Sequence, residues 1–155
     1  LVAGILAAWL TREGRRVLHE YIGYGVLVLL AVRIVWGFVG TPHARFADFV
    51  RSPHETLRYA RQLLRGSAPR YVGHNPLGGW MMLALLALTL AIGATGWLYT
   101  TDRYWGVEWV ERLHATLTDI LLACVLLHVL GALVMSYRHR ENLIAAMFHG
   151  RKRPQ

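Results

Sequence analysis

The chain has 155 residues, 55% of them hydrophobic, and its mean hydropathy of +0.34 is high for a soluble protein. Its net charge of +8 is concentrated in two of the connecting segments, a distribution that argues against nucleic acid as the partner. The single cysteine, Cys124, is interpreted as a packing residue and excludes an intrachain disulfide framework, a Cys₄ cluster and a C-x-x-C-H covalent haem site.

Four apolar segments predict an all-α protein that spans a membrane. Residues 17–40, 77–99 and 115–135 are nearly free of charge, and each is long enough to cross roughly 30 Å of hydrocarbon at about 1.5 Å per residue. Residues 1–10 are apolar but cover about half a span, and we interpret them as the end of an earlier helix. The expected fold of residues 1–155 is therefore a single transmembrane four-helix bundle whose first helix is only partly present.

The segment between the second and third helices contains the signals of a short helix at residues 53–65. Ser52 is a candidate N-cap, Pro53 occupies the first helical position, and Glu55 completes a capping-box pattern. Apolar residues fall on one face with arginines around them: Leu57, Ala60, Leu63 and Leu64. This pattern predicts an amphipathic helix on the membrane surface.

The distribution of basic residues predicts the orientation of the chain in the membrane. Residues 41–70 hold six arginines and the tail, residues 136–155, holds five Lys or Arg, whereas residues 11–16 and 100–114 hold three and two. Since basic residues mark cytoplasmic segments, we expect the amphipathic helix and the C-terminal tail on the cytoplasmic side.

Three histidines carry the functional prediction. His114 and His128 are fourteen residues apart, 40° short of four full turns, so they share one side of the fourth helix at a separation of roughly 21 Å. Two ligands so far apart serve two centres at different membrane depths. His19 stands at the start of the second helix, which runs in the same direction as the fourth, so His19 and His114 are expected at the same depth near the outer surface.

Two facing imidazoles match bis-histidine ligation of a b-type haem. Gly23 and Gly131, each about one turn from a histidine, leave room for a haem face. Arg33 lies fourteen residues after His19, at the depth of His128, and is a candidate partner for a haem propionate. The alternative for Arg33 is a snorkelling residue at the inner interface.

The remaining polar residues allow weaker interpretations. His74 is either part of a helix start, with Asn75 as N-cap, or a polar group at the edge of an inner haem or quinone pocket. Asp119 is rotated away from the histidines, which favours a polar contact near the interface over a role in protonating a substrate. No H-E-x-x-H or paired-cysteine spacing supports zinc. Four further histidines are expected to be solvated: His43, His54, His139 and His149.

With these residues the chain resembles the bacterial cytochrome b561 and nickel–iron hydrogenase b-type cytochrome family. The matching stretches are "VLHEYIGY", "RIVWGFVGTPHARFADFV", "YVGHNPLGG", "LHATLTDILLACVLLHVLGAL" and "ENLIAAMFHGRKR". The resemblance implies a multi-pass protein of the bacterial cytoplasmic membrane that holds two b haems. By that pattern His19 and His114 ligate one haem, and His128 ligates the other with a histidine expected upstream of Leu1.

The resemblance also implies respiratory electron transport between the quinone pool and a redox partner, either a hydrogenase-like enzyme or a periplasmic cytochrome c. A stand-alone quinone-coupled oxidoreductase such as a superoxide oxidase is the alternative within this class. A haem-free proton or metal transporter that uses His and Asp is the alternative from another class. Membrane lipid is an expected partner, and a homodimer is left open.

Overall fold

The computed structural model describes residues 1–41, 44–69, 71 and 73–139, and this part of the chain contains helices and no strands. The helices are α1 (Val2–Leu10), α2 (Arg16–Val39), α3 (Phe46–Phe49), α4 (Pro53–Leu64), α5 (Pro76–Tyr99) and α6 (Glu108–His139). The predictions for His43, His149, the side chain of His139 and residues 140–155 of the tail lie outside the described residues.

Three of the helices are long and apolar enough to cross a membrane: Arg16–Val39, Pro76–Tyr99 and Glu108–Arg138. Large apolar side chains such as Val28, Leu90 and Leu126 are exposed on their outer surfaces, where lipid would cover them. The all-α membrane bundle predicted from the sequence is therefore confirmed.

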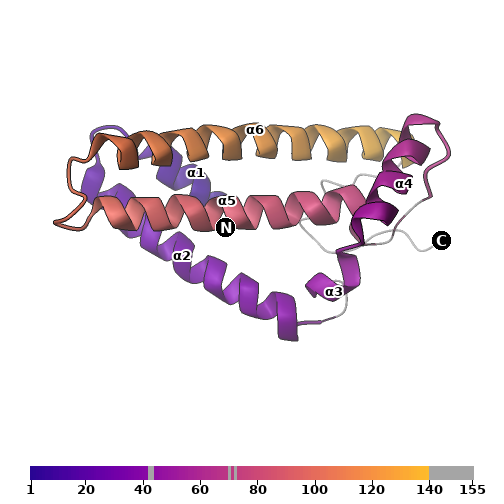
Figure 1. The fold of residues 1–155 in the computed structure, drawn as a ribbon, viewed down its shortest axis with the longest axis horizontal. Coiled ribbons are helices and arrows are strands. Elements are labelled where there is room, and N and C mark those ends of the chain that lie inside the picture. Colours follow the sequence, from indigo (N-terminus) through magenta and orange to yellow (C-terminus); the bar gives the residue numbers. More distant parts are fainter. Residues whose placement is uncertain (42–43, 70, 72, 140–155) are drawn as a thin grey trace.

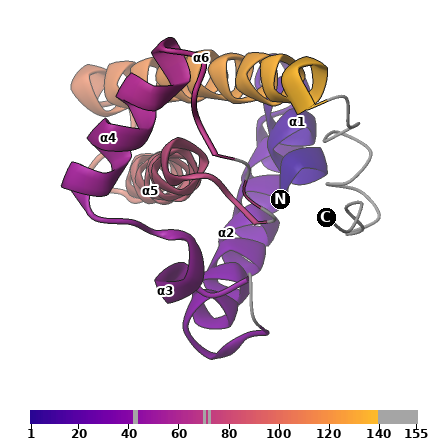
Figure 2. The same ribbon diagram turned by 90° about the vertical axis from the view of Figure 1, so that its right-hand side faces the viewer.

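Helix α5 is the centre of the bundle. It packs against α6 along its length, against α2 and against α4, while among the described helices α1 packs only against α2. Figure 1 shows α5 and α6 side by side, with α2 diverging from them toward α3. In the end-on view of Figure 2, α5 is surrounded by α2, α4 and α6. Among the described residues, α2 and α6 do not pack against each other.

Glycines allow both neighbours of α2 to approach it closely. A Cβ atom at Gly4 of α1 would lie 2.8 Å from Cγ2 of Val26. A Cβ atom at Gly93 of α5 would overlap the side chain of Leu27. Small residues at such positions let membrane helices pack backbone to backbone. Both contacts therefore fix α2 in place between α1 and α5.

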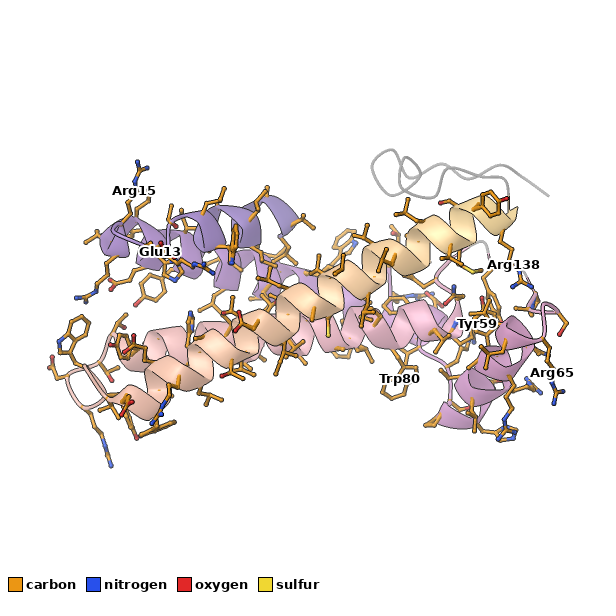
Figure 3. The ribbon with its side chains drawn as sticks, turned by 90° about the horizontal axis from the view of Figure 1, so that it is seen from above. Glu13, Arg15, Tyr59, Arg65, Trp80 and Arg138 are labelled. Atoms are coloured by element: carbon orange, nitrogen blue, oxygen red, sulfur yellow. The ribbon has the colours of Figure 1, made fainter. Side chains whose placement is uncertain are left out.

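Helix α4 begins as predicted and lies across the ends of α5 and α6 (Figure 2). The Oγ atom of Ser52 accepts a hydrogen bond from the backbone N–H of Glu55 at 3.2 Å, which confirms the predicted cap. The residue that α4 buries is Tyr59, which is 2% exposed, and Arg138 of α6 lies beside it in Figure 3. Leu57 is exposed, so the predicted apolar face only partly packs on protein.

Two elements differ from the sequence expectation. Helix α6 starts at Glu108, seven residues before the apolar run that predicted it. The apolar run missed these first turns because they contain the charged residues Glu108 and Glu111. Acidic side chains stabilise a helix N-terminus but add nothing to a hydropathy signal. The four-residue helix Phe46–Phe49 was not expected; Phe49 is buried there, beside α5.

Candidate functional site

The structure brings two of the three predicted histidines together. The ring centroids of His19, near the start of α2, and His114, in the second turn of α6, are 6.1 Å apart, with the ring planes at 78°. The described parts of α2 and α6 do not otherwise pack against each other. The two imidazoles therefore meet between these helices, at the end of the bundle away from α4.

Each imidazole is held through its Nδ1 atom by a backbone carbonyl of a neighbouring helix. Nδ1 of His19 lies 2.8 Å from the carbonyl oxygen of Ala8 in α1, and Nδ1 of His114 lies 3.0 Å from that of Ile92 in α5. A carbonyl oxygen only accepts hydrogen bonds, so both Nδ1 atoms carry the proton. The lone pair of each ring is then on Nε2. Metal-ligating histidines in proteins are held in this way.

Further contacts with α5 orient His114. Oγ1 of Thr95 lies 3.2 Å from Nδ1 of His114. A Cβ atom at Gly96 would lie 3.1 Å from Cε1 of the same ring, so the ring rests on the backbone of α5. The small-residue run "AIGATG", residues 91–96, is the sequence signal for this close approach. The sequence did not show that His114 occupies the space.

The distance between the rings suits one metal ion between them. An imidazole nitrogen lies about 2.0–2.1 Å from a bound ion such as zinc, and the ring centroid is roughly 1 Å further away. Two imidazoles on opposite sides of one ion therefore have centroids about 6 Å apart. In the described part of the chain, no three His, Cys, Asp or Glu side chains are grouped closely enough to hold a metal ion. The site thus offers two imidazoles rather than the four ligands typical of structural zinc.

Open space adjoins the glycines predicted beside the histidines. A Cβ atom at Gly23, one turn after His19, would meet no atom within 4 Å. The same holds for Gly131, three residues after His128. A flat group can therefore approach the backbone of α2 and of α6 at these two positions.

Arg33 and His128 lie toward the other end of the bundle. Nη1 of Arg33 is buried and, among the described residues, has no hydrogen-bond partner, while the guanidinium carbon lies 5.4 Å from the ring centroid of Phe46. An unpaired buried guanidinium nitrogen is costly unless an anion binds it. Because α6 is continuous, His128 shares a side with His114. No hydrogen bond or ring contact joins His128 to Arg33 in the described structure.

The other candidate residues lie apart from the histidine pair. His74 contacts Phe49, with ring centroids 5.0 Å apart, at the start of α5. Oδ1 of Asn75 accepts a hydrogen bond from the N–H of Gly78 at 2.8 Å, which confirms Asn75 as the N-cap. Asp119 is exposed on α6. Two residues remain to be placed: His54, exposed on α4, and Cys124, half-buried on α6.

A family model described as prokaryotic cytochrome b561 matches residues 1–150. The chain belongs to this family. The resemblance predicted from the histidine motifs is thereby confirmed, and with it the assignment as a membrane b-type cytochrome that transfers electrons. Family membership also implies haem b as the cofactor.

Curated relatives of this cytochrome b561 family member are named as probable Ni/Fe-hydrogenase B-type cytochrome subunits. The protein from Rhizobium leguminosarum bv. viciae is 24% identical over 88% of this chain and 68% of its own length. That from Azotobacter vinelandii is 28% identical over 87% and 67%. That from Rhodobacter capsulatus is 26% identical over 88% and 62%. No solved structure matches the chain.

The residues of this b561 family member fit a haem. At one end of the bundle the rings of His19 and His114 lie together with their Nε2 lone pairs unprotonated, and open space adjoins Gly23. Toward the other end, Arg33 has a buried nitrogen that is unpaired among the described residues and suits a carboxylate. The carbonyls of Ala8 and Ile92 were not foreseen, because every residue has a carbonyl group and the sequence cannot mark the one that is used.

Proposed function

We propose that this chain is the cytochrome subunit of a membrane oxidoreductase, in which His19 and His114 bind the iron of one b-type haem through their Nε2 atoms. The observation that carries the proposal is the pair itself. The two rings, on α2 and α6, lie 6.1 Å apart, and each donates its Nδ1–H to a carbonyl. That combination matches a bis-imidazole iron site and its outer hydrogen bonds.

A haem bound in this way would take up and release single electrons, with no open position on the iron for substrate. The protein orients the two ligands, keeps Nδ1 protonated and surrounds the site with apolar helices. Burial and ligand orientation are the means by which a protein sets a haem potential. Nothing in this role requires a general acid or base.

We further propose that His128 ligates a second haem toward the α4 end of the bundle. Support comes from the four-turn spacing between His114 and His128 and from the open space at Gly131. The second ligand would come from outside the described residues. Arg33, with its unpaired Nη1, would bind a propionate of this haem. His74, at the start of α5, would lie at the edge of this haem or of a quinone pocket.

The direction and partners of electron transfer are part of the same proposal. The α4 end would lie in the cytoplasm of a bacterial cell and the histidine pair near the outer face, a proposal supported by the arginines of α4 and of the segment before it. The names of the relatives, probable Ni/Fe-hydrogenase B-type cytochrome subunits, support a hydrogenase-like partner. The quinone pool is proposed as the other redox partner. A periplasmic cytochrome c is the other candidate partner.

A haem count tests the ligand assignment. The purified membrane protein should show a b-type α-band in the dithionite-reduced minus oxidised spectrum, and His19→Ala and His114→Ala should each lose one haem per chain. His54→Ala is the matched control, because His54 is exposed on α4. The absence of any b-type band in the wild-type protein, or an unchanged haem count in both variants, would overturn the proposal.

The partner assignment needs a separate measurement. In membranes that contain a hydrogenase, hydrogen should reduce the haem of the wild-type protein, and a quinone analogue should then reoxidise it. Reduction by a cytochrome c but not by hydrogen would replace the hydrogenase-like partner with the periplasmic one.

A further inference from the structure

We propose that Thr95 is a positioning residue for His114: its hydroxyl group shares the Nδ1–H of His114 with the carbonyl of Ile92 and so tunes the haem ligand. The inference rests on the proposed function, because it takes His114 as an iron ligand. It adds a residue outside the ligand set.

The geometry of the Thr95 hydroxyl determines which way its proton points. Thr95 is 7% exposed, and Oγ1 lies 2.9 Å from the carbonyl oxygen of Ala91 and 3.0 Å from that of Ile92. The hydroxyl has one proton, which it donates to one of these carbonyls, since neither can donate in return. Its lone pairs are then free to accept from Nδ1 of His114 at 3.2 Å.

Nδ1–H of His114 therefore has two acceptors, the carbonyl oxygen of Ile92 at 3.0 Å and Oγ1 of Thr95 at 3.2 Å. A three-centre hydrogen bond of this kind restricts rotation of the ring more than one acceptor does. The backbone at Gly96 limits the ring further, because a Cβ atom there would lie 3.1 Å from Cε1. Within the described part of the chain, His19 has one such acceptor, the carbonyl oxygen of Ala8. The two ligands of the pair are thus held unequally.

A second acceptor also changes the chemistry of Nε2. Acceptors on Nδ1–H draw the proton away from the ring and raise the basicity of the ligating nitrogen. A more basic ligand favours the ferric over the ferrous state, so removing the Thr95 hydroxyl should raise the reduction potential. At a fixed ambient potential, we expect the ratio of ferrous to ferric haem to rise about threefold. At 59 mV per tenfold change in this ratio, that is a rise of roughly 30 mV in the midpoint potential.

A redox titration of three variants tests this inference. Thr95→Val removes the hydroxyl at nearly constant shape, and Thr95→Ser keeps it. Thr89→Val is the matched control, because Thr89 is also buried in α5, at 6% exposed, and donates to its own i−4 carbonyl, that of Leu85, at 2.7 Å. The readouts are the midpoint potential and the low-spin electron paramagnetic resonance signal of the haem that is lost in His114→Ala.

We expect a raised potential and an altered low-spin signal in Thr95→Val, with wild-type values in Thr95→Ser and Thr89→Val. An unchanged potential in Thr95→Val, or equal shifts in Thr95→Val and Thr89→Val, would overturn the role of Thr95. If Thr95→Val loses the haem, Thr95→Ser decides: wild-type haem supports the role, and loss in both contradicts it. The haem count of His114→Ala tests the proposed function separately, so the two failures are distinguishable.

Discussion

Nδ1 of His19 lies 2.8 Å from the carbonyl oxygen of Ala8, so helix α1 orients a side chain that belongs to α2. The contact depends on how closely the two helices pack, and they pack closely where Gly4 faces Val26. The nine residues of α1 are therefore part of the candidate site although they supply none of its ligands.

The first prediction concerns this α1–α2 contact. Gly4→Val should push α1 away from α2, because a Cβ atom at Gly4 already lies 2.8 Å from Cγ2 of Val26. Overpacking of this kind costs about 1–3 kcal/mol, and here it also loosens the carbonyl that holds His19. We expect less bound haem and a lower melting temperature. The Soret absorbance measures both, the first at room temperature and the second on heating. Adding Val26→Ala should restore both, and a double variant that is worse than Gly4→Val would contradict this explanation.

The second prediction uses the open space beside His19. Gly23→Leu should leave the helices folded, because a Cβ atom there meets nothing within 4 Å, but should compete with a haem for that space. Gly25→Leu is the control, since Gly25 is exposed on the same helix and its Cβ position is also open. We expect a haem-to-protein ratio several-fold lower in Gly23→Leu only. Equal ratios in the two variants would place the haem elsewhere.

The sequence predicted the parts of this structure that depend on apolar length and helical period. Hydropathy placed α2 and α5 within one residue of their observed bounds because lipid requires continuous apolar runs. The start of α6 and the four-residue α3 were missed, since polar turns outside the hydrocarbon leave no such signal. The matched direction of the two helices, with each histidine near the start of its helix, predicted His114 opposite His19.

The groups that hold the histidines were beyond the reach of the sequence. Two are backbone carbonyls, of Ala8 and Ile92, and the choice of carbonyl depends on how α1 and α5 dock. The third is Thr95, and a helical threonine ordinarily bonds its own i−4 carbonyl, as Thr89 does. Only the three-dimensional structure shows that Thr95, unlike Thr89, also contacts His114.

The third prediction concerns Arg33. Because Nη1 is buried and has no hydrogen-bond partner among the described residues, Arg33→Gln should remove a positive charge without removing a hydrogen bond of that atom. Loss of a cation near a haem favours the ferric state, so the potential of the haem assigned to His128 should fall by roughly 40 mV, about 1 kcal/mol for one electron. Arg58→Gln, on the exposed face of α4, is the control. A redox titration in which both variants match the wild-type protein would favour the snorkelling interpretation of Arg33.

The fourth prediction concerns the junction of α4 with α5 and α6. The Tyr59 hydroxyl is buried and has no hydrogen-bond partner in the described structure, so Tyr59→Phe should be neutral or stabilising. Tyr59→Ala should destabilise the protein by about 3–5 kcal/mol, because it removes a buried aromatic ring. Thermal unfolding in detergent measures both. A large loss of stability in Tyr59→Phe would show that the hydroxyl has a partner.

The same tyrosine gives the fifth prediction, a pH dependence. Burial raises the pKa of the Tyr59 phenol above its ordinary value of 10.0; Tyr71 raises it further and Arg138 opposes the shift. Because the folded-state pKa is raised, the neutral phenol of Tyr59 contributes fully to the free energy of unfolding below pH 10.0. This contribution is lost as the pH rises through the folded-state pKa. Tyr59→Phe should therefore lose less stability than the wild-type protein above pH 10.0, and identical alkaline profiles would contradict the burial of an ionisable phenol.

The coordination state of the iron tests the central claim most directly. If His19 and His114 occupy both axial positions, the oxidised wild-type protein gives a low-spin electron paramagnetic resonance signal, and the reduced protein does not bind carbon monoxide at this haem. His19→Ala and His114→Ala should each lose this haem and its low-spin signal. Carbon monoxide binding by the wild-type haem, or a low-spin signal that persists unchanged in both variants, would contradict bis-histidine ligation by this pair.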